Sequence, residues 1–261
     1  MLWESTLSTQ DPIPAFQALV DAWKDAGNKV FVLRADNEIP DLRQFLSDNF
    51  QYLGKPCPLA EDVNQGGRNG QRSGELWFEV RYDPKHPDAY RHSANAQPLH
   101  TDGSYIPSFP NATLLSCVKN AGNGGETIFV DAEDLVNCLE QEDPTLLAEI
   151  SEYAMPHSRS GDHRVAKIVE KEDGKTRVNW NYYCVDENVE SKGRDIANKF
   201  FEYHQTSSAL KAKTLAVKLG PGDMVAWKDR QVLHGRNSFE AQQESERFIW
   251  KCAIDIGNID G

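Results

Sequence analysis

Residues 215–236 read LAVKLGPGDMVAWKDRQVLHGR, and this stretch decides the fold. It holds two apolar strand patterns, 215–219 and 224–227, which flank the tight turn Gly-Pro-Gly-Asp at 220–223. A further short segment ends in an apolar pair and a histidine, Val-Leu-His at 232–234. Short strands separated by Gly and Pro turns are typical of β-sandwiches and barrels. The stretch therefore predicts consecutive strands of such a fold.

The same kind of pattern continues along the rest of the chain. Strands are predicted at 29–34, 76–82, 113–118, 127–130 and 248–256, with a hairpin of 165–169 and 177–183 across Asp173-Gly174. Amphipathic helices are predicted around 16–23, 42–53 and 196–203, and a helical insert around 132–153. No repeat or break in composition marks a second domain. We therefore predict one domain over residues 1–261, mainly β with flanking helices, built as a jelly roll.

Charge restricts the partners of the protein. The formal net charge is -12, and the 28 basic residues are scattered along the chain. Because phosphate contacts dominate nucleic-acid binding, this surface disfavours nucleic acids and anionic lipids. No apolar run approaches the roughly 20 residues that a membrane span needs. We expect a small-molecule partner, no nucleic acid and no membrane.

The cysteines and the first residues bear on the compartment. The five cysteines are widely spaced and form no C-x-x-C, which is typical of reduced thiols rather than of a disulfide framework or a zinc ribbon. The residues MLWE at 1–4 lack the basic and apolar regions of a signal peptide. We expect a cytoplasmic protein, and the sequence leaves a homo-oligomer open.

Two histidines and a carboxylate are the candidate metal ligands. A chain with 7 histidines and 40 acidic residues is expected to contain His-x-Asp or His-x-Glu by chance, and this one holds it twice. The first copy, His86-Pro87-Asp88, lies in a polar segment between prolines and is interpreted as a surface turn. The second, His100-Thr101-Asp102, borders a strand pattern, where positions i and i+2 point to one face. With His234 it would form the two-histidine, one-carboxylate site of non-haem iron oxygenases.

Seven segments follow one another along the chain: KVFVLR (29–34), Leu53-Gly54, LHTDGSY (99–105), TLLSCV (113–118), NGGETIFVD (123–131), PGDMVAW (221–227) and VLHGRNSF (232–239). In this order they resemble the iron(II)/2-oxoglutarate dioxygenases of the taurine dioxygenase superfamily, which includes clavaminate synthase and γ-butyrobetaine hydroxylase. The resemblance implies a double-stranded β-helix in which His100, Asp102 and His234 hold iron(II). It also implies 2-oxoglutarate and dioxygen as co-substrates, with succinate and carbon dioxide released.

The resemblance also implies a site for the remote carboxylate of 2-oxoglutarate. Arg247 follows His234 by 13 residues, and a guanidinium fork grips a carboxylate by two parallel hydrogen bonds. Thr127 carries over as a hydroxyl donor to the same carboxylate. Arg236 is interpreted as a residue that supports the metal site or braces the loop, and Asp223 as a turn residue. Asp102 favours hydroxylation, desaturation or a related oxidation over halogenation, because related halogenases carry a small residue there.

The substrate is less clearly indicated. Lys251 lies four residues after Arg247, where several relatives place a basic residue that binds an anionic group of the substrate. Asn181, in the run Trp-Asn-Tyr-Tyr at 180–183, resembles an asparagine near the substrate of γ-butyrobetaine hydroxylase. Core packing is expected for Trp180 and Tyr182. The 77–97 region gives no transferable match, and the polar 59–74 loop is either disordered or a lid over the site.

These observations lead to one main hypothesis and two alternatives. The main hypothesis is an oxygenase that hydroxylates an unactivated C–H bond of a small carboxylate or amino-acid-like substrate. One alternative is a non-catalytic jelly roll that binds a metal or small ligand as a sensor. The other is an oxygenase that acts on a peptide. The joint presence of Asp102 and Arg247 favours the enzyme over the sensor.

Overall fold

A computed structural model describes residues 1–60, 73–87 and 89–257 of the chain. Most of the 59–74 loop therefore lies outside the described residues, and its role as a lid stays a prediction. In the described part, the strands form two main sheets and two small hairpins. None of the described helices combines the length and the apolar character that crossing a bilayer requires.

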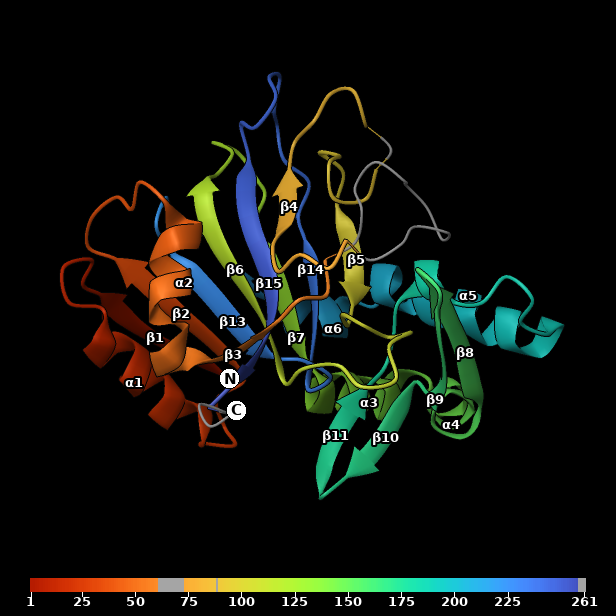
Figure 1. The fold of residues 1–261 in the computed structure, drawn as a ribbon. Helices are drawn as coiled ribbons and strands as arrows, with labels where there is room; N and C mark the ends of the chain where they lie inside the picture. The colour runs from red at the N-terminus through yellow and green to blue at the C-terminus, as the bar shows by residue number, and fades with distance from the viewer. Residues whose placement is uncertain (61–72, 88, 258–261) are drawn as a thin grey trace.

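The larger sheet has seven strands among the described residues (Figure 1). Apart from the parallel pair β1 and β2, its neighbours are antiparallel. In spatial order the strands are β1 (Leu2–Leu7), β2 (Val30–Ala35), β13 (Met224–Lys228), β6 (Ala112–Lys119), β15 (Phe248–Ile256) and β3 (Gly54–Cys57), with β4 (Phe78–Arg81) also paired to β15.

The smaller sheet carries much of the candidate site. It has four antiparallel strands in the described residues, in the order β12 (Leu215–Val217), β7 (Thr127–Asp131), β14 (Val232–Arg236) and β5 (Gln97–His100). Its inner face packs on the larger sheet, where the rings of Phe129 and Trp227 meet edge to face with centroids 5.4 Å apart. The two sheets thus form the predicted mainly β jelly roll.

Alternating residues divide the larger sheet between two cores. Val225 and Trp227 of β13 face the smaller sheet, whereas Met224 and Ala226 face the helices on the other side. Those helices, α1 (Ile13–Trp23) and α2 (Leu42–Leu53), cover the outer face of the sheet (Figure 1). Both were predicted from their periodicity.

A third core lies on the outer side of the smaller sheet. Leu99, Val130 and Leu233 point into it, and the fully buried Trp180 fills part of it. The surrounding elements are α3 (Ala132–Glu142), α4 (Pro144–Glu152), β8 (Ala154–Arg159), β9 (Asp162–Lys167), β10 (Val169–Glu172), β11 (Lys175–Val178), the short 3₁₀ helix η1 (Tyr182–Cys184), α5 (Ser191–Thr206) and α6 (Ser208–Ala212).

The predicted hairpin is partly wrong. Strands β10 and β11 do pair across Asp173-Gly174, where both residues have positive φ. However, residues 165–167 belong to β9, which pairs with β8 instead. Residues 180–183 do not continue the strand, because the side chain of Asn181 accepts a hydrogen bond from the Tyr183 N–H and begins η1. A local side-chain cap has replaced strand pairing there.

Candidate metal centre

Three side chains from two adjacent strands and the loop after one of them converge on one point. His100 ends β5 and is paired with His234 of β14, so their rings lie 4.2 Å apart. Asp102 follows two residues later, with Oδ1 3.9 Å from His100 Nε2 and Oδ2 3.7 Å from His234 Nε2. The three ligand atoms all lie within 4.8 Å of one another. This is close enough for one small cation to contact all three.

Hydrogen bonding orients the His100 ring. Its Nδ1 lies 2.9 Å from the Pro98 carbonyl oxygen, which can only accept, so Nδ1 carries the proton. The Tyr90 hydroxyl lies 3.2 Å from the same nitrogen. This arrangement leaves the lone pair on Nε2, the nitrogen that faces Asp102. A metal-binding histidine is held in this way by an acceptor on its other nitrogen.

Asp102 is held from the larger sheet. The Lys251 ammonium on β15 donates to Oδ1 at 2.7 Å, and the Thr113 hydroxyl on β6 donates to Oδ2 at 2.9 Å. Burial alone would raise the pKa of Asp102, but the Lys251 ammonium beside it outweighs this effect and holds the pKa below its usual value. The carboxylate is therefore ionised, which is the form that binds a metal.

Both histidines are buried and neutral. Burial lowers the pKa of His100 and of His234, and the proximity of His100 lowers that of His234 further. Neutral imidazole is the ligand form of histidine. The charge, protonation and spacing of the three side chains therefore fit a divalent metal ion.

Asp229 is a buried residue that the sequence analysis missed. Its Oδ1 accepts the Trp227 indole N–H at 3.3 Å and the Asp102 backbone N–H at 3.4 Å. The Trp227 ring lies 4.5 Å from the His234 ring. Asp229 is thus linked to two of the three residues: to Asp102 through a backbone hydrogen bond, and to His234 through the Trp227 ring. The sequence does carry a signal for Asp229, because it is an acidic residue just after a predicted strand and five residues before His234.

Arg247 immediately precedes β15 and lies beside the Gly-Gly turn at 124–125. It is 2% exposed, and Nη2 donates to the Gly125 carbonyl at 3.4 Å. Within the described residues, its Nε and Nη1 have no hydrogen-bond partner. A Cβ on Gly125, which has a φ of +77°, would lie 3.1 Å from Arg247 Nε. The side chain of Thr127, two residues further on, is also buried.

Arg236 lies on β14, two residues beyond His234. Its Nη2 donates to the backbone carbonyls of Ser93 and Asn95, at 2.7 and 2.6 Å. Burial, followed by the nearby Arg247, lowers the pKa of Arg236 to about 9. Arg236 therefore braces the loop before β5 through backbone carbonyl groups.

The comparisons with known proteins place this geometry in a family. A family model described as "Taurine catabolism dioxygenase TauD, TfdA family" matches residues 43–253. The chain belongs to the TauD/TfdA family. This match covers both histidines, the carboxylate and Arg247.

Curated relatives of this TauD/TfdA chain include two dioxygenases. It is 26% identical over 162 residues to gamma-butyrobetaine dioxygenase of Homo sapiens, which covers 58% of this chain and 42% of that protein. It is 22% identical over 264 residues to mitochondrial trimethyllysine dioxygenase of Gallus gallus, covering 94% and 60%. The chain thus spans less than two thirds of the length of either relative.

Solved structures support the fold of this TauD/TfdA chain. An asparagine oxygenase, in complex with Fe(II), 2S,3S-3-hydroxyasparagine and succinate, superposes with a TM-score of 0.69 at 11% identity, covering 94% of this chain and 80% of that one. The non-heme iron oxygenase OrfP, in complex with Fe and alpha-ketoglutaric acid, gives 0.63 at 14% identity, covering 97% and 87%. At these identities the likeness concerns the fold.

The two substrate candidates relate to the triad in different ways. Lys251 contacts Asp102 directly. Asn181 follows Trp180, whose backbone exchanges hydrogen bonds with Thr101, between His100 and Asp102: Thr101 N to Trp180 O at 2.7 Å and Trp180 N to Thr101 Oγ1 at 2.9 Å. The core position predicted for Trp180 is confirmed, since it is fully buried.

Other residues singled out in the sequence lie away from the triad or serve the fold. The imidazole of His86 is 58% exposed, as expected of a surface turn, while Asp88 lies outside the described residues. Asp223 accepts from the backbone of Gly220 and pairs with Arg34, so it is a turn residue. Within the 77–97 region, which gave no transferable match, Arg81 forms ion pairs with Glu79 and Glu244.

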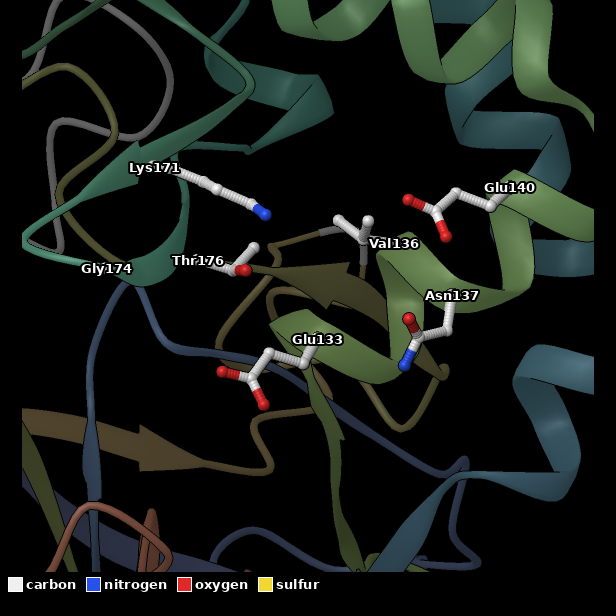
Figure 2. A pocket seen from close by; sticks show the side chains of 7 residues that line it. All are labelled: Glu133, Val136, Asn137, Glu140, Lys171, Gly174 and Thr176. Carbon is white, nitrogen blue, oxygen red and sulfur yellow. The ribbon is translucent and has the colours of Figure 1, made fainter.

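A separate polar pocket lies between α3 and the β10–β11 hairpin. Figure 2 shows Glu133 and Glu140 from α3 and Lys171 from the hairpin lining it. It shares no residue with the triad or with the surroundings of Arg247 described above. The metal centre is therefore not part of this pocket.

Proposed function

We propose that this protein is an iron(II)- and 2-oxoglutarate-dependent oxygenase that hydroxylates an unactivated C–H bond of a small carboxylate or amino-acid-like substrate. The observation that carries the proposal is the convergence of His100, Asp102 and His234 within 4.8 Å. Two histidines and one carboxylate suit iron(II) and leave other positions on the metal open. When bound, iron with 2-oxoglutarate supplies the oxidation of a C–H bond by dioxygen, and succinate and carbon dioxide are released.

The protein's contribution at the metal is orientation. His100 would offer Nε2, because Nδ1 donates to the Pro98 carbonyl. Asp102 would offer one carboxylate oxygen while Thr113 and Lys251 restrict its rotation. Holding ligands in place before the metal arrives lowers the entropic cost of binding. The carboxylate at Asp102 supports hydroxylation or a related oxidation rather than halogenation.

Arg247 and Thr127 would hold the remote carboxylate of 2-oxoglutarate. Two nitrogens of the Arg247 guanidinium are buried without a partner in the described structure, and a buried charge of this kind is stabilised by pairing. Burial lowers the pKa of Arg247 to about 10, so it is still a cation at neutral pH. A carboxylate accepting from Nε and Nη would satisfy both charge and hydrogen bonding.

Lys251 and Asn181 would bind the substrate. An ammonium group has three donors, and Asp102 accepts one of them from Lys251. The remaining donors can meet a substrate carboxylate on the open side of the metal. Asn181 uses Oδ1 to cap η1, which leaves its Nδ2 to donate to the substrate. Lys251 would thus bind an anionic group and Asn181 a hydrogen-bond acceptor. An amino-acid-like compound carries both groups on one small molecule.

We further propose a single oxygenase domain with a helical insert at 132–153, which acts in the cytoplasm on small molecules. The net charge of -12 supports small molecules over nucleic acids as partners.

The test follows co-substrate binding and turnover separately. Purified protein is mixed anaerobically with iron(II) and 2-oxoglutarate, and the metal-to-ligand absorption band is recorded. Dioxygen is then admitted with a panel of amino acids and other small carboxylates, and succinate is measured. The proposal requires both the band and succinate release that a panel member accelerates.

Asp102→Ala is the matched negative control, with Asp195→Ala as an exposed acidic control on α5. The former should lose metal binding and turnover, and the latter should retain both. A band without succinate under any panel member would favour the sensor. No band in the parent protein would refute the co-substrate assignment.

A further inference from the structure

Two buried arginines lie against one aromatic ring. The guanidinium carbon of Arg236 is 4.9 Å from the centroid of Phe239, and that of Arg247 is 5.4 Å from it. Arg236 is 3% exposed and Arg247 2%. In the part of the chain that the structure describes, neither forms an ion pair. Phe239 is therefore the shared contact of two cations that, among the described residues, have no carboxylate within ion-pair distance.

The backbone around Phe239 is held from two sides. On one side the Phe239 N–H donates to the Ala94 carbonyl at 3.1 Å. On the other, the Gly125 N–H donates to the Ser238 carbonyl at 3.1 Å, and Gly124 forms an isolated bridge with Phe239. A Cβ on Gly124 would lie 2.0 Å from the Ser238 carbonyl oxygen, so only glycine permits this approach. Residues 238–239 thus lie between the turn beside Arg247 and the loop before β5.

That loop extends to the metal ligand His100. Arg236 holds it at the carbonyls of Ser93 and Asn95. The Gln97 amide donates to the Tyr90 carbonyl at 2.6 Å, and the Tyr90 hydroxyl lies 3.2 Å from His100 Nδ1. The segment 89–97 therefore connects Arg236 with the edge of the metal centre.

We infer that Arg236 is a positioning residue which, through Phe239, makes the order of segment 89–97 depend on the anion bound at Arg247. The inference rests on the proposed function, because the anion is the remote carboxylate of 2-oxoglutarate. A carboxylate on Arg247 would offset the repulsion between the two guanidinium groups and so stabilise the arrangement in which both lie against Phe239. Arg236 then holds Ser93 and Asn95 more firmly, and Tyr90 is fixed beside the metal.

The coupling has a direction and a measurable size. Binding at Arg247 should slow local opening of 89–97 by about 10-fold, within the range typical of coupled sites. By reciprocity, a ligand that orders 89–97 should tighten 2-oxoglutarate binding by the same factor. Binding of 2-oxoglutarate would thus order the segment 89–97 beside the metal centre.

The experiment measures hydrogen–deuterium exchange of peptides covering 89–97 in the full chain. The protein is held anaerobically with iron(II), with and without 2-oxoglutarate, and co-substrate binding is read from the absorption band. The parent protein should show slower exchange in 89–97 once 2-oxoglutarate binds. In Phe239→Leu and Arg236→Gln the band should form with affinity within about 5-fold of the parent, whereas the added protection should vanish.

Phe239→Leu leaves both arginines and their hydrogen bonds in place, so it tests the coupling without removing a buried charge. Arg81→Gln is the matched control, since Arg81 lies before the same segment and pairs with Glu79 and Glu244. It should keep the parent's protection. Full protection in Phe239→Leu, or none in a parent protein that forms the band, would overturn the inference alone. A parent protein that forms no band would overturn the proposed function as well.

Discussion

The ammonium nitrogen of Lys251 lies 2.7 Å from Oδ1 of Asp102 and joins the last strand of the larger sheet to the loop that follows β5. The pair is nearly enclosed, with the Lys251 side chain 21% and the Asp102 side chain 11% exposed. Thr113 holds the second oxygen of the same carboxylate from β6. The candidate ligand is therefore oriented by the sheet opposite to the one that carries the two histidines.

Lys251→Met should destabilise the protein without added metal by about 2 kcal/mol, because it leaves a buried carboxylate without its cation. Added divalent metal should then raise the melting temperature of the variant more than that of the parent, since the metal supplies the missing positive charge. Thermal melts with and without metal measure both effects. Lys199→Met, at an exposed ion pair with Asp195, should change stability by less than about 1 kcal/mol.

Thr113→Val should weaken metal binding by about 10-fold while leaving the fold intact. The substitution keeps the β-branched shape in the sheet and removes only the hydroxyl that donates to Asp102 Oδ2. Titration with cobalt(II), followed by its absorption spectrum, gives the affinity and reports the ligand geometry. An unchanged affinity and spectrum would mean that Thr113 does not orient the ligand.

Arg247→Gln should raise the dissociation constant of 2-oxoglutarate by roughly 100-fold, which corresponds to the loss of a charge-assisted pair of hydrogen bonds. Metal affinity should stay within about 3-fold, because Arg247 contacts Gly125 rather than the triad. The absorption band gives the first quantity and a metal titration gives the second. Equal loss of both affinities would instead indicate a general structural role.

Two buried histidines should make the protein sensitive to mild acid. Burial lowers the pKa of His157 to about 4 and that of His204 to about 3, against an ordinary value near 6.5. Between pH 6.5 and about 4, the unfolded chain binds protons at these positions and the folded protein does not. Stability should therefore fall as the pH drops below 6.5, by about 1.4 kcal/mol per pH unit for each histidine.

His204→Leu should reduce this slope, because the site is an apolar one beside Trp180 and Phe200. Urea denaturation at pH 5.0, 5.5, 6.0 and 7.5 compares the two proteins. His86→Ala removes an exposed histidine and should leave the slope unchanged. A slope that is equal in His204→Leu and in the parent would contradict the assignment.

Much of the fold could be predicted from local patterns. The strand at Met224–Lys228 begins with a continuous apolar run and is buried on both faces, and the helix at Leu42–Leu53 is buried on the face that its periodicity indicates. The stretch after Val178 could not be predicted in the same way. Its apolar and aromatic residues suit a strand, but the cap made by Asn181 and the packing of Trp180 end it.

The sequence by itself, through residue types, the order of its motifs and their resemblance to a family, predicted which residues could serve a metal and an anion: His100, Asp102, His234 and Arg247. Only the tertiary structure decided what surrounds them: Lys251 on Asp102, Asp229 between Asp102 and Trp227, and Phe239 beside Arg236 and Arg247. These contacts join strands that are distant in the chain, and their geometry depends on how two sheets pack, which no local pattern contains.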